Sequence, residues 1–174
     1  MLSINQKTIS KTIKLNGVGL HNGVNADLII KPAAENFGIN FCRVDIDKDD
    51  LIPANFKNVI EPILCTKIAN KNGISISTVE HLMAALFGLG IDNALIEINN
   101  EEVPILDGSA KEFIETIINT GIKVSNSPIK IIKINKTVEF KDGKRTISIS
   151  PSKLSLDIDF ELNYDNQIIG NQRN

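Results

Sequence analysis

Two histidines, His21 and His81, are the side chains of this sequence best suited to metal binding or proton transfer. His81 follows Glu80 at the start of a segment with helical periodicity, and a helix N-terminus favours the neutral imidazole that binds metals. His21 lies in a turn with three glycines, residues 17–23, where the backbone can approach a ligand closely. Cys65 and Thr66 add a thiol beside a hydroxyl, so these residues are the candidates for a site.

Each candidate also has a purely structural explanation. Glu80 has the spacing of a capping box with Ser77, and His81 can be a hydrogen-bonded side chain at the edge of its element. The glycines around His21 can serve a tight turn alone, and Cys65 can be a small core residue. A Glu-His dipeptide is much less specific than a spaced H-E-x-x-H pair. From the residues alone, both interpretations stay open.

The helix that carries Glu80 and His81 is predicted to be buried. Its apolar residues recur at i, i+3, i+4 and i+7 (Val79, Leu82, Met83, Leu86). Most of the other positions up to Gly88 and Gly90, which end the helix, are also apolar, as in a buried helix. A Glu and a His in the first turn of such a helix need polar partners or a cleft. Small residues on the side of His81, Ala84 and Ala85, leave room for a ligand.

The elements around this helix predict an α+β fold, a mixed sheet packed with two helices. Alternating or apolar runs predict strands, with Asn72-Gly73 as a hairpin turn, over residues 24–30, 38–44, 64–69, 74–77, 93–98 and 103–106. A turn at Asp107-Gly108 precedes a second capping-box pair and an amphipathic helix that Gly121 closes (Ser109 and Glu112; Phe113, Ile114, Ile117, Ile118). Residues 1–123 are therefore expected to form a first domain.

A polar segment, residues 124–128, is expected to be a linker to a second unit. Residues 129–174 contain only predicted strands, over residues 129–140, 145–150 and 153–162, so they are expected to be the strand-rich start of a second, incomplete α+β domain. The last strand places five apolar side chains on one face, and no helix follows to cover it. The second unit is therefore expected to be labile, to dock on the first, or to pair with another chain.

Composition narrows the classes of function. Hydrophobic residues make up 42% and charged residues 23% of 174 residues, as in globular proteins, and the net charge of −2 comes without a basic patch. Nucleic acid is therefore not an expected partner. With two cysteines, no apolar leader and no stretch long enough to cross a membrane, the sequence predicts a cytoplasmic protein without a transmembrane segment.

Taken together, the motifs resemble those of the UDP-3-O-acyl-N-acetylglucosamine deacetylase (LpxC) family. The resemblance rests on the segments 17–23, 64–66, 75–82, 88–93 and 104–110, and it extends from about residue 6 to the end, as an amino-terminal portion of that family. It implies two similar α+β domains with zinc and substrate between them. It also implies removal of the N-acetyl group from a UDP-linked, 3-O-acylated glucosamine, which releases acetate in the committed step of lipid A biosynthesis in Gram-negative bacteria.

The resemblance assigns roles to the candidates and shows what is missing. It implies that Glu80 is the general base and His81 a Zn²⁺ ligand, with His21, Cys65 and Thr66 as substrate-binding residues. Zinc would lower the pKa of its water to about 7, and Glu80 would take the proton. The family takes its other ligands, a His and an Asp four residues on, and a further catalytic His from its second half. Neither histidine of this sequence has an Asp at i+4.

We therefore expect this chain to be inactive alone and to need a missing carboxy-terminal half or a complementing chain. Two alternatives are a non-catalytic module that binds sugar nucleotides and a remnant of a disrupted gene. A zinc-binding and activity assay would separate the enzyme from these alternatives.

Overall fold

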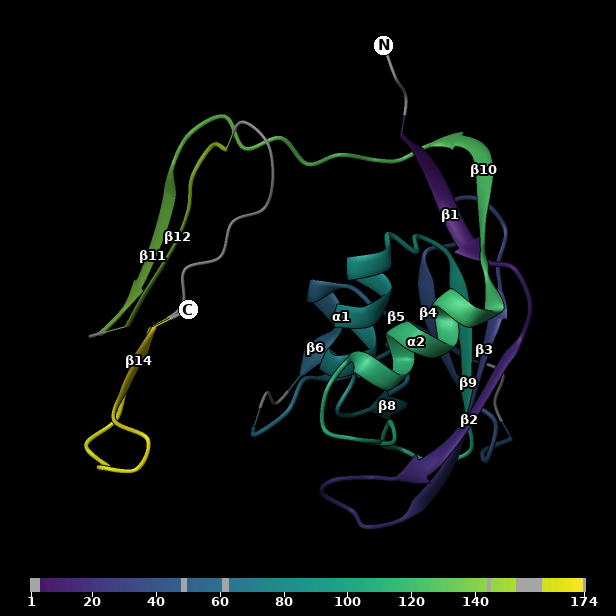
Figure 1. Cartoon of the computed structure of the whole chain (residues 1–174), viewed down its shortest axis with the longest axis horizontal. Helices are drawn as coiled ribbons and strands as arrows, with labels where there is room; N and C mark the ends of the chain where they lie inside the picture. The colour runs from purple at the N-terminus through teal and green to yellow at the C-terminus, as the bar shows by residue number, and fades with distance from the viewer. Residues whose placement is uncertain (1–3, 48–49, 61–62, 144, 153–160, 174) are drawn as a thin grey trace. The chain divides into compact units, whose positions relative to one another are not determined.

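The protein is described by a computed structural model that covers residues 4–47, 50–60, 63–143, 145–152 and 161–173 (Figure 1). The chain divides into two compact units, Met1–Ile129 and Lys130–Asn174. In the part of the first unit that the structure describes, two α-helices pack with a mixed sheet, so the predicted α+β class is confirmed.

The centre of the first unit is a five-stranded sheet with the order β2-β3-β9-β4-β5. Its strands are β2 (Ile13–Val18), β3 (Asn25–Pro32), β4 (Ile39–Arg43), β5 (Leu51–Pro53) and β9 (Ala94–Ile98). All neighbours are antiparallel except β4 and β9, which run parallel. A parallel pair needs a long crossover, and here the crossover contains a helix.

Two helices, α1 (Glu80–Leu89) and α2 (Lys111–Thr120), cover one face of this sheet (Figure 1). Alternate residues of β3 and β9 are fully buried beneath them, which is the pattern of a sheet with one covered face. The core between the layers is made of aliphatic and Phe side chains, chiefly Leu28, Ile30, Phe41, Leu82, Leu86, Ile96, Ile98, Phe113 and Ile117.

Both helices end where the glycines predict. Gly90 has a left-handed backbone (φ 68°), and its N–H and that of Ile91 bond to the last carbonyls of α1, including that of Leu86. Gly121 closes α2 with bonds from its N–H to the carbonyls of Ile117 and Ile118. The turn at Gly108 (φ 81°) also forms as predicted.

A smaller three-stranded sheet leads into α1. It consists of β6 (Val59–Ile60), which follows a short 3-10 helix (Phe56–Asn58), β7 (Lys67–Ala69) and β8 (Ser75–Ile76). The predicted hairpin is confirmed, with β7 paired to β8 and Gly73 at φ 79° in the turn. Residues 103–106, however, form no named strand: the Val103 N–H bonds to the carbonyl of Ser77, beside an isolated bridge at Glu102.

The expected linker over residues 124–128 is wrong, because these residues belong to strand β10 (Ile122–Pro128). β10 pairs antiparallel with the first strand, β1 (Asn5–Ile9), within the first unit. Its polar side chains lie at an edge where Glu35 accepts bonds from the Asn126 N–H and the Ser127 hydroxyl. The polar composition that indicated a linker therefore reflects an edge strand with bonded side chains.

The described residues of the second unit form two hairpins. In the first, β11 (Val138–Asp142) pairs with β12 (Arg145–Ile149), and in the second, β13 (Glu161–Asn163) pairs with β14 (Asn171–Arg173). The strand expected over 129–140 begins only at Val138. Most of the strand expected over 153–162 lies outside the described residues. That this unit begins a second, similar domain stays a prediction.

Candidate functional site

The predicted capping box at the start of α1 does not form. Val79, at the N-cap position, has a helical backbone and no side-chain cap, and Thr78 before it has φ 57°. The Ser77 hydroxyl donates to the carbonyl of Glu101 (3.2 Å), and the Glu80 carboxylate accepts from the backbone N–H of Thr66 (3.1 Å). Both side chains are therefore used in contacts with distant segments, which the capping-box spacing could not reveal.

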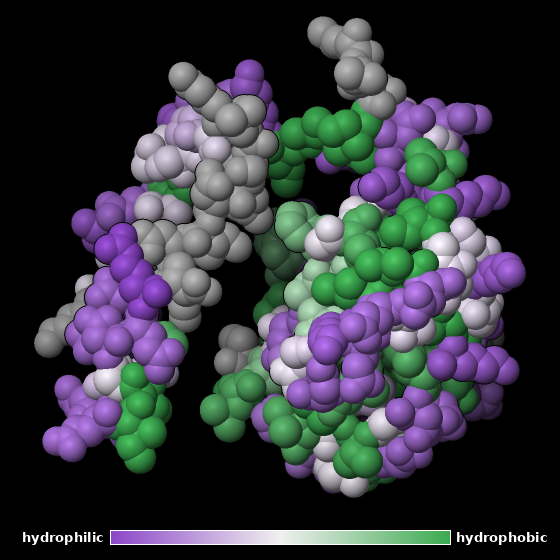
Figure 2. All heavy atoms as spheres, viewed as in Figure 1, coloured by the Kyte–Doolittle hydropathy of each residue, from purple (hydrophilic) through white to green (hydrophobic). Residues whose placement is uncertain are grey.

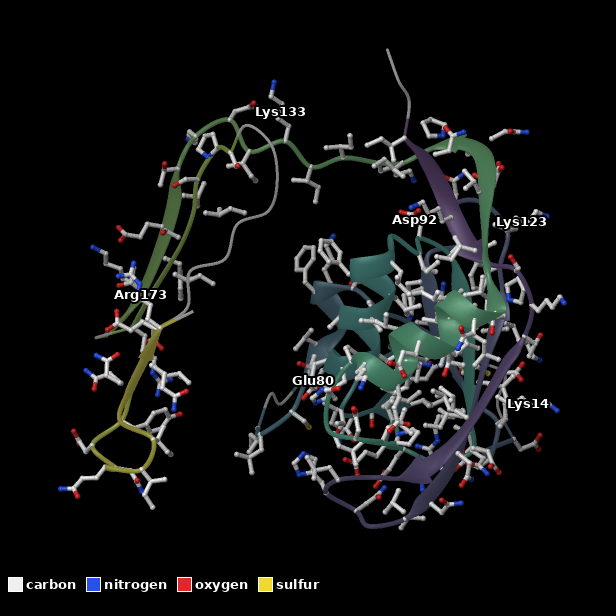
Figure 3. The ribbon with its side chains drawn as sticks, viewed as in Figure 1. Lys14, Glu80, Asp92, Lys123, Lys133 and Arg173 are labelled. Carbon is white, nitrogen blue, oxygen red and sulfur yellow. The ribbon has the colours of Figure 1, made fainter. Side chains whose placement is uncertain are left out.

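The bond between Thr66 and Glu80 joins two groups of predicted site residues. Glu80 lies in the first turn of α1 (Figure 3), and its Oε2 accepts a hydrogen bond from the N–H of Thr66, which follows Cys65. Glu80 and His81 are both half-buried, so neither is sealed in the core nor fully in solvent. Of the small residues beside His81, Ala85 belongs to the core, and only Ala84 is exposed.

A shallow cavity of about 320 Å³ brings His21 and Cys65 together, although they are distant in sequence. The rest of its lining consists of two aliphatic side chains, a cation and a hydroxyl (Ile63, Leu64, Lys67 and Ser77). Figure 2 shows hydrophobic side chains exposed in this part of the first unit, where the loop that precedes β7 lies, and Ile63 and Leu64 are 75% and 87% exposed. Glu80 and His81 do not line this cavity; Glu80 is joined to its wall through Thr66.

The buried carboxylate of Glu102 is a site residue that sequence analysis missed. Its side chain is 1% exposed and accepts from the N–H groups of His21 (3.0 Å) and Asn22 (2.9 Å) and from the Thr78 hydroxyl (2.8 Å). It thus ties the glycine turn to the residue two places before Glu80. Within the run Asn99-Asn100-Glu101-Glu102, no spacing or periodicity distinguishes Glu102 from its polar neighbours.

The hydrogen bonds control the charge of Glu102. Burial acts to raise the pKa of its carboxyl, but the N–H groups of Asn22 and His21 and the Thr78 hydroxyl outweigh burial, so the pKa lies below its ordinary value. The carboxylate is consequently the form that the fold holds at neutral pH.

The described residues do not by themselves make a complete zinc site. In the part of the chain that the structure covers, no three His, Cys, Asp or Glu side chains gather in a metal-binding arrangement, whereas a catalytic zinc normally has three protein ligands. His81 can supply one. A site of the expected kind needs ligands in addition to those described.

Among the described helices, none is long and apolar enough to cross a membrane.

Comparison with known proteins defines the family of this α+β fold with its Glu-His pair. The family model of UDP-3-O-acyl N-acetylglycosamine deacetylase (LpxC) matches residues 6–174. A Pasteurella multocida protein named UDP-3-O-acyl-N-acetylglucosamine deacetylase is 41% identical over 167 residues, 96% of this chain and 54% of the relative. A Nautilia profundicola protein of the same name is 44% identical over 168 residues, 97% of this chain and 56% of the relative.

The chain belongs to the UDP-3-O-acyl-N-acetylglucosamine deacetylase family, and the resemblance found from the motifs is confirmed. It spans about half the length of the curated relatives it matches and corresponds to an amino-terminal portion of them.

Proposed function

We propose that this chain forms the amino-terminal half of a zinc-dependent deacetylase that converts UDP-3-O-acyl-N-acetylglucosamine to the free amine and acetate, the committed step of lipid A biosynthesis. The observation that supports it best is the hydrogen bond from Thr66 N–H to Glu80 Oε2, which joins the expected general base to the expected substrate-binding residues Cys65 and Thr66. The relatives' printed names supply the substrate class. Because the substrate carries a nucleotide, the reaction would take place on the cytoplasmic, aqueous side.

The geometry of Glu80 suits a general base. Its Oε2 accepts the Thr66 N–H, and among the hydrogen bonds of the described residues its Oε1 accepts none. Oε2 therefore orients the carboxylate, while Oε1 can take a proton from a water molecule. His21, Cys65 and Thr66 would contact the UDP-linked substrate: the first two line one cavity, and Thr66 donates its N–H to the Glu80 carboxylate.

The proposed zinc dependence assigns His81 as one ligand. Bound zinc would supply Lewis-acid activation of water and of the amide carbonyl. The other ligands would come from the missing carboxy-terminal half or from a complementing chain. The second unit, Lys130–Asn174, would begin the second α+β domain.

The test is acetate release from UDP-3-O-acyl-N-acetylglucosamine with zinc present. We expect little or no turnover from this chain alone. We expect turnover from a chimera in which residues 1–174 replace the matched half of the Pasteurella multocida relative. In that chimera Glu80→Gln should lower kcat by about a hundredfold or more, as loss of a general base does.

A matched control is Glu115→Gln, which removes an exposed carboxylate from α2 and should leave kcat unchanged. Full turnover by the chain alone, abolished by Glu80→Ala, would contradict the missing-ligand argument. A folded chimera that binds UDP without hydrolysing the substrate would instead support a non-catalytic module.

A further inference from the structure

A buried carboxylate that joins two separate parts of the site needs its own explanation. Among the described residues, Glu102 is the one charged residue that is buried, with 1% of its surface exposed. Placing a charge there is costly unless several hydrogen bonds replace its water. Here Oε1 accepts from the Thr78 hydroxyl and the His21 N–H, and Oε2 accepts from the N–H groups of Asn22 and His21.

On one side, the carboxylate holds the glycine turn. The turn is closed by bonds from Gly19 N–H to the Val24 carbonyl (2.9 Å) and from Gly23 N–H to the Gly19 carbonyl (3.1 Å). Gly19 leaves space that Glu102 fills, because a Cβ at Gly19 would lie 2.6 Å from Oε2. The shape of the turn and the position of the carboxylate therefore depend on each other.

On the other side, the carboxylate holds the chain that enters α1. Thr78 is 2% exposed and has φ 57°, a left-handed backbone that a β-branched residue rarely adopts. Such a conformation persists only where neighbouring contacts determine it. The bond from its hydroxyl to Glu102 is one such contact, and the Val79 N–H bonds to the Thr66 carbonyl as another (3.3 Å). Glu80 and His81 follow directly.

We propose that Glu102 is a positioning residue, whose carboxylate fixes the turn that carries His21 against the entry to helix α1 and so sets His21 relative to Glu80 and His81. It acts through the backbone of His21 and the side chain of Thr78. That the positioned groups form an active site rests on the proposed function, but the positioning itself does not.

The test uses the 174-residue chain and NMR spectroscopy, without substrate or metal. In the unmodified protein, the amide signals of His21 and Asn22 should move together in one acid titration as their shared acceptor takes a proton. The signals of the nearby His21 imidazole and of the adjacent Glu101 should be assigned in the same titration, so that their effects can be told apart from that of Glu102. This measurement needs no variant, so it cannot be confused with a folding defect.

The variant Glu102→Gln keeps the size of the side chain and removes its charge. Amide exchange at His21 and Asn22 should become about tenfold faster or more, as expected for weakened bonds to a charged acceptor. Alkylation of Cys65, which shares the cavity with His21, should also accelerate, while buried Cys42 provides the slow internal reference. Amides of the core strand β9 should keep their protection. The matched control is Glu101→Gln, at an exposed neighbour.

The proposal is overturned if the His21 and Asn22 signals do not respond to the titration of Glu102. It is also overturned if Glu102→Gln changes exchange across β9 as much as in the turn, since Glu102 would then stabilise the whole unit rather than position the site. Because no catalytic readout is used, these outcomes are independent of deacetylase activity. If the turn responds as expected and the chimera is inactive, only the proposed function fails.

Discussion

The close approach at Gly19 makes Gly19→Ala a demanding test of the packing around Glu102. The added methyl carbon would lie 2.3 Å from Asn22 Oδ1 and 2.6 Å from Glu102 Oε2, both closer than real contacts allow. Asn22 Oδ1 accepts the Val24 N–H within the same turn, and Glu102 is buried, so neither can withdraw without disturbing the turn. Relieving the overlap must therefore lengthen the bonds that the carboxylate accepts.

The size of the effect can be worked out from these contacts. Overpacking costs about 1–3 kcal/mol, and a weakened bond to a charged group adds roughly 1 kcal/mol, so the free energy of unfolding should fall by about 2–4 kcal/mol. With an unfolding entropy of roughly 2.1 cal/mol/K per residue over a unit of the size of Met1–Ile129, each kcal/mol lowers Tm by about 4 °C. The expected decrease in Tm is roughly 7–15 °C.

The assay is thermal unfolding followed by circular dichroism, with urea unfolding to measure the free energy. Gly88→Ala is the matched control, because its Cβ would meet nothing within 4 Å and the residue lies inside α1. Alanine there should be neutral or stabilise by about 0.5–1 kcal/mol. A Gly19→Ala protein as stable as the Gly88→Ala control would refute the reasoning, because the turn would then move without disturbing Glu102.

Three further predictions concern the charge, the core and the second unit. Because the folded-state pKa of Glu102 is lowered, the stability that its charge contributes is present above the ordinary glutamate pKa of about 4.3 and is lost as the pH falls through the folded-state pKa. The difference in free energy of unfolding between the unmodified protein and Glu102→Gln, measured in urea, should therefore shrink in acid. A difference that stays constant with pH would contradict this. Phe41→Ala should lower the free energy of unfolding by about 3–5 kcal/mol, since Phe41 is fully buried in the sheet, and urea unfolding would measure it. Amides of the β11–β12 hairpin should exchange far faster than those of β9, because a hairpin alone is marginal in water. Equal protection would show that the second unit is not labile.

Local signals accounted for much of the fold. The helical spacing around Leu82 and Leu86, the glycines that end both helices and the turn at Gly73 depend on neighbours within a few residues, so the sequence predicts them correctly. The polar edge of β10 was misread because its partners, β1 and Glu35, lie far away in sequence. Composition alone could not separate a solvated linker from a paired edge strand.

The site shows the same division. Glu80 was recognised as a candidate, but its spacing from Ser77 suggested a local cap, whereas its observed partner is the Thr66 N–H. In the second pair, Asp107 accepts the Ser109 N–H that Glu112 was expected to take, whereas the Ser109 hydroxyl accepts the Lys111 N–H at the start of α2. Glu102 was not found at all, since each of its partners is more than twenty residues away. Long-range polar contacts leave no periodic trace in a sequence.

The pairing of β1 with β10 has a consequence for synthesis on the ribosome. The first strand of the unit, Asn5–Ile9, has an isolated bridge from Thr8 to Asn93, but its antiparallel strand partner, Ile122–Pro128, is made later. Helix α1 and the five-stranded sheet can assemble earlier, but the pairing of β1 with β10 waits for nearly the whole unit, and closing so long a loop carries an entropic cost. We therefore expect nascent chains that stop before residue 122 to be more sensitive to proteases at the amino terminus than chains that extend past Pro128.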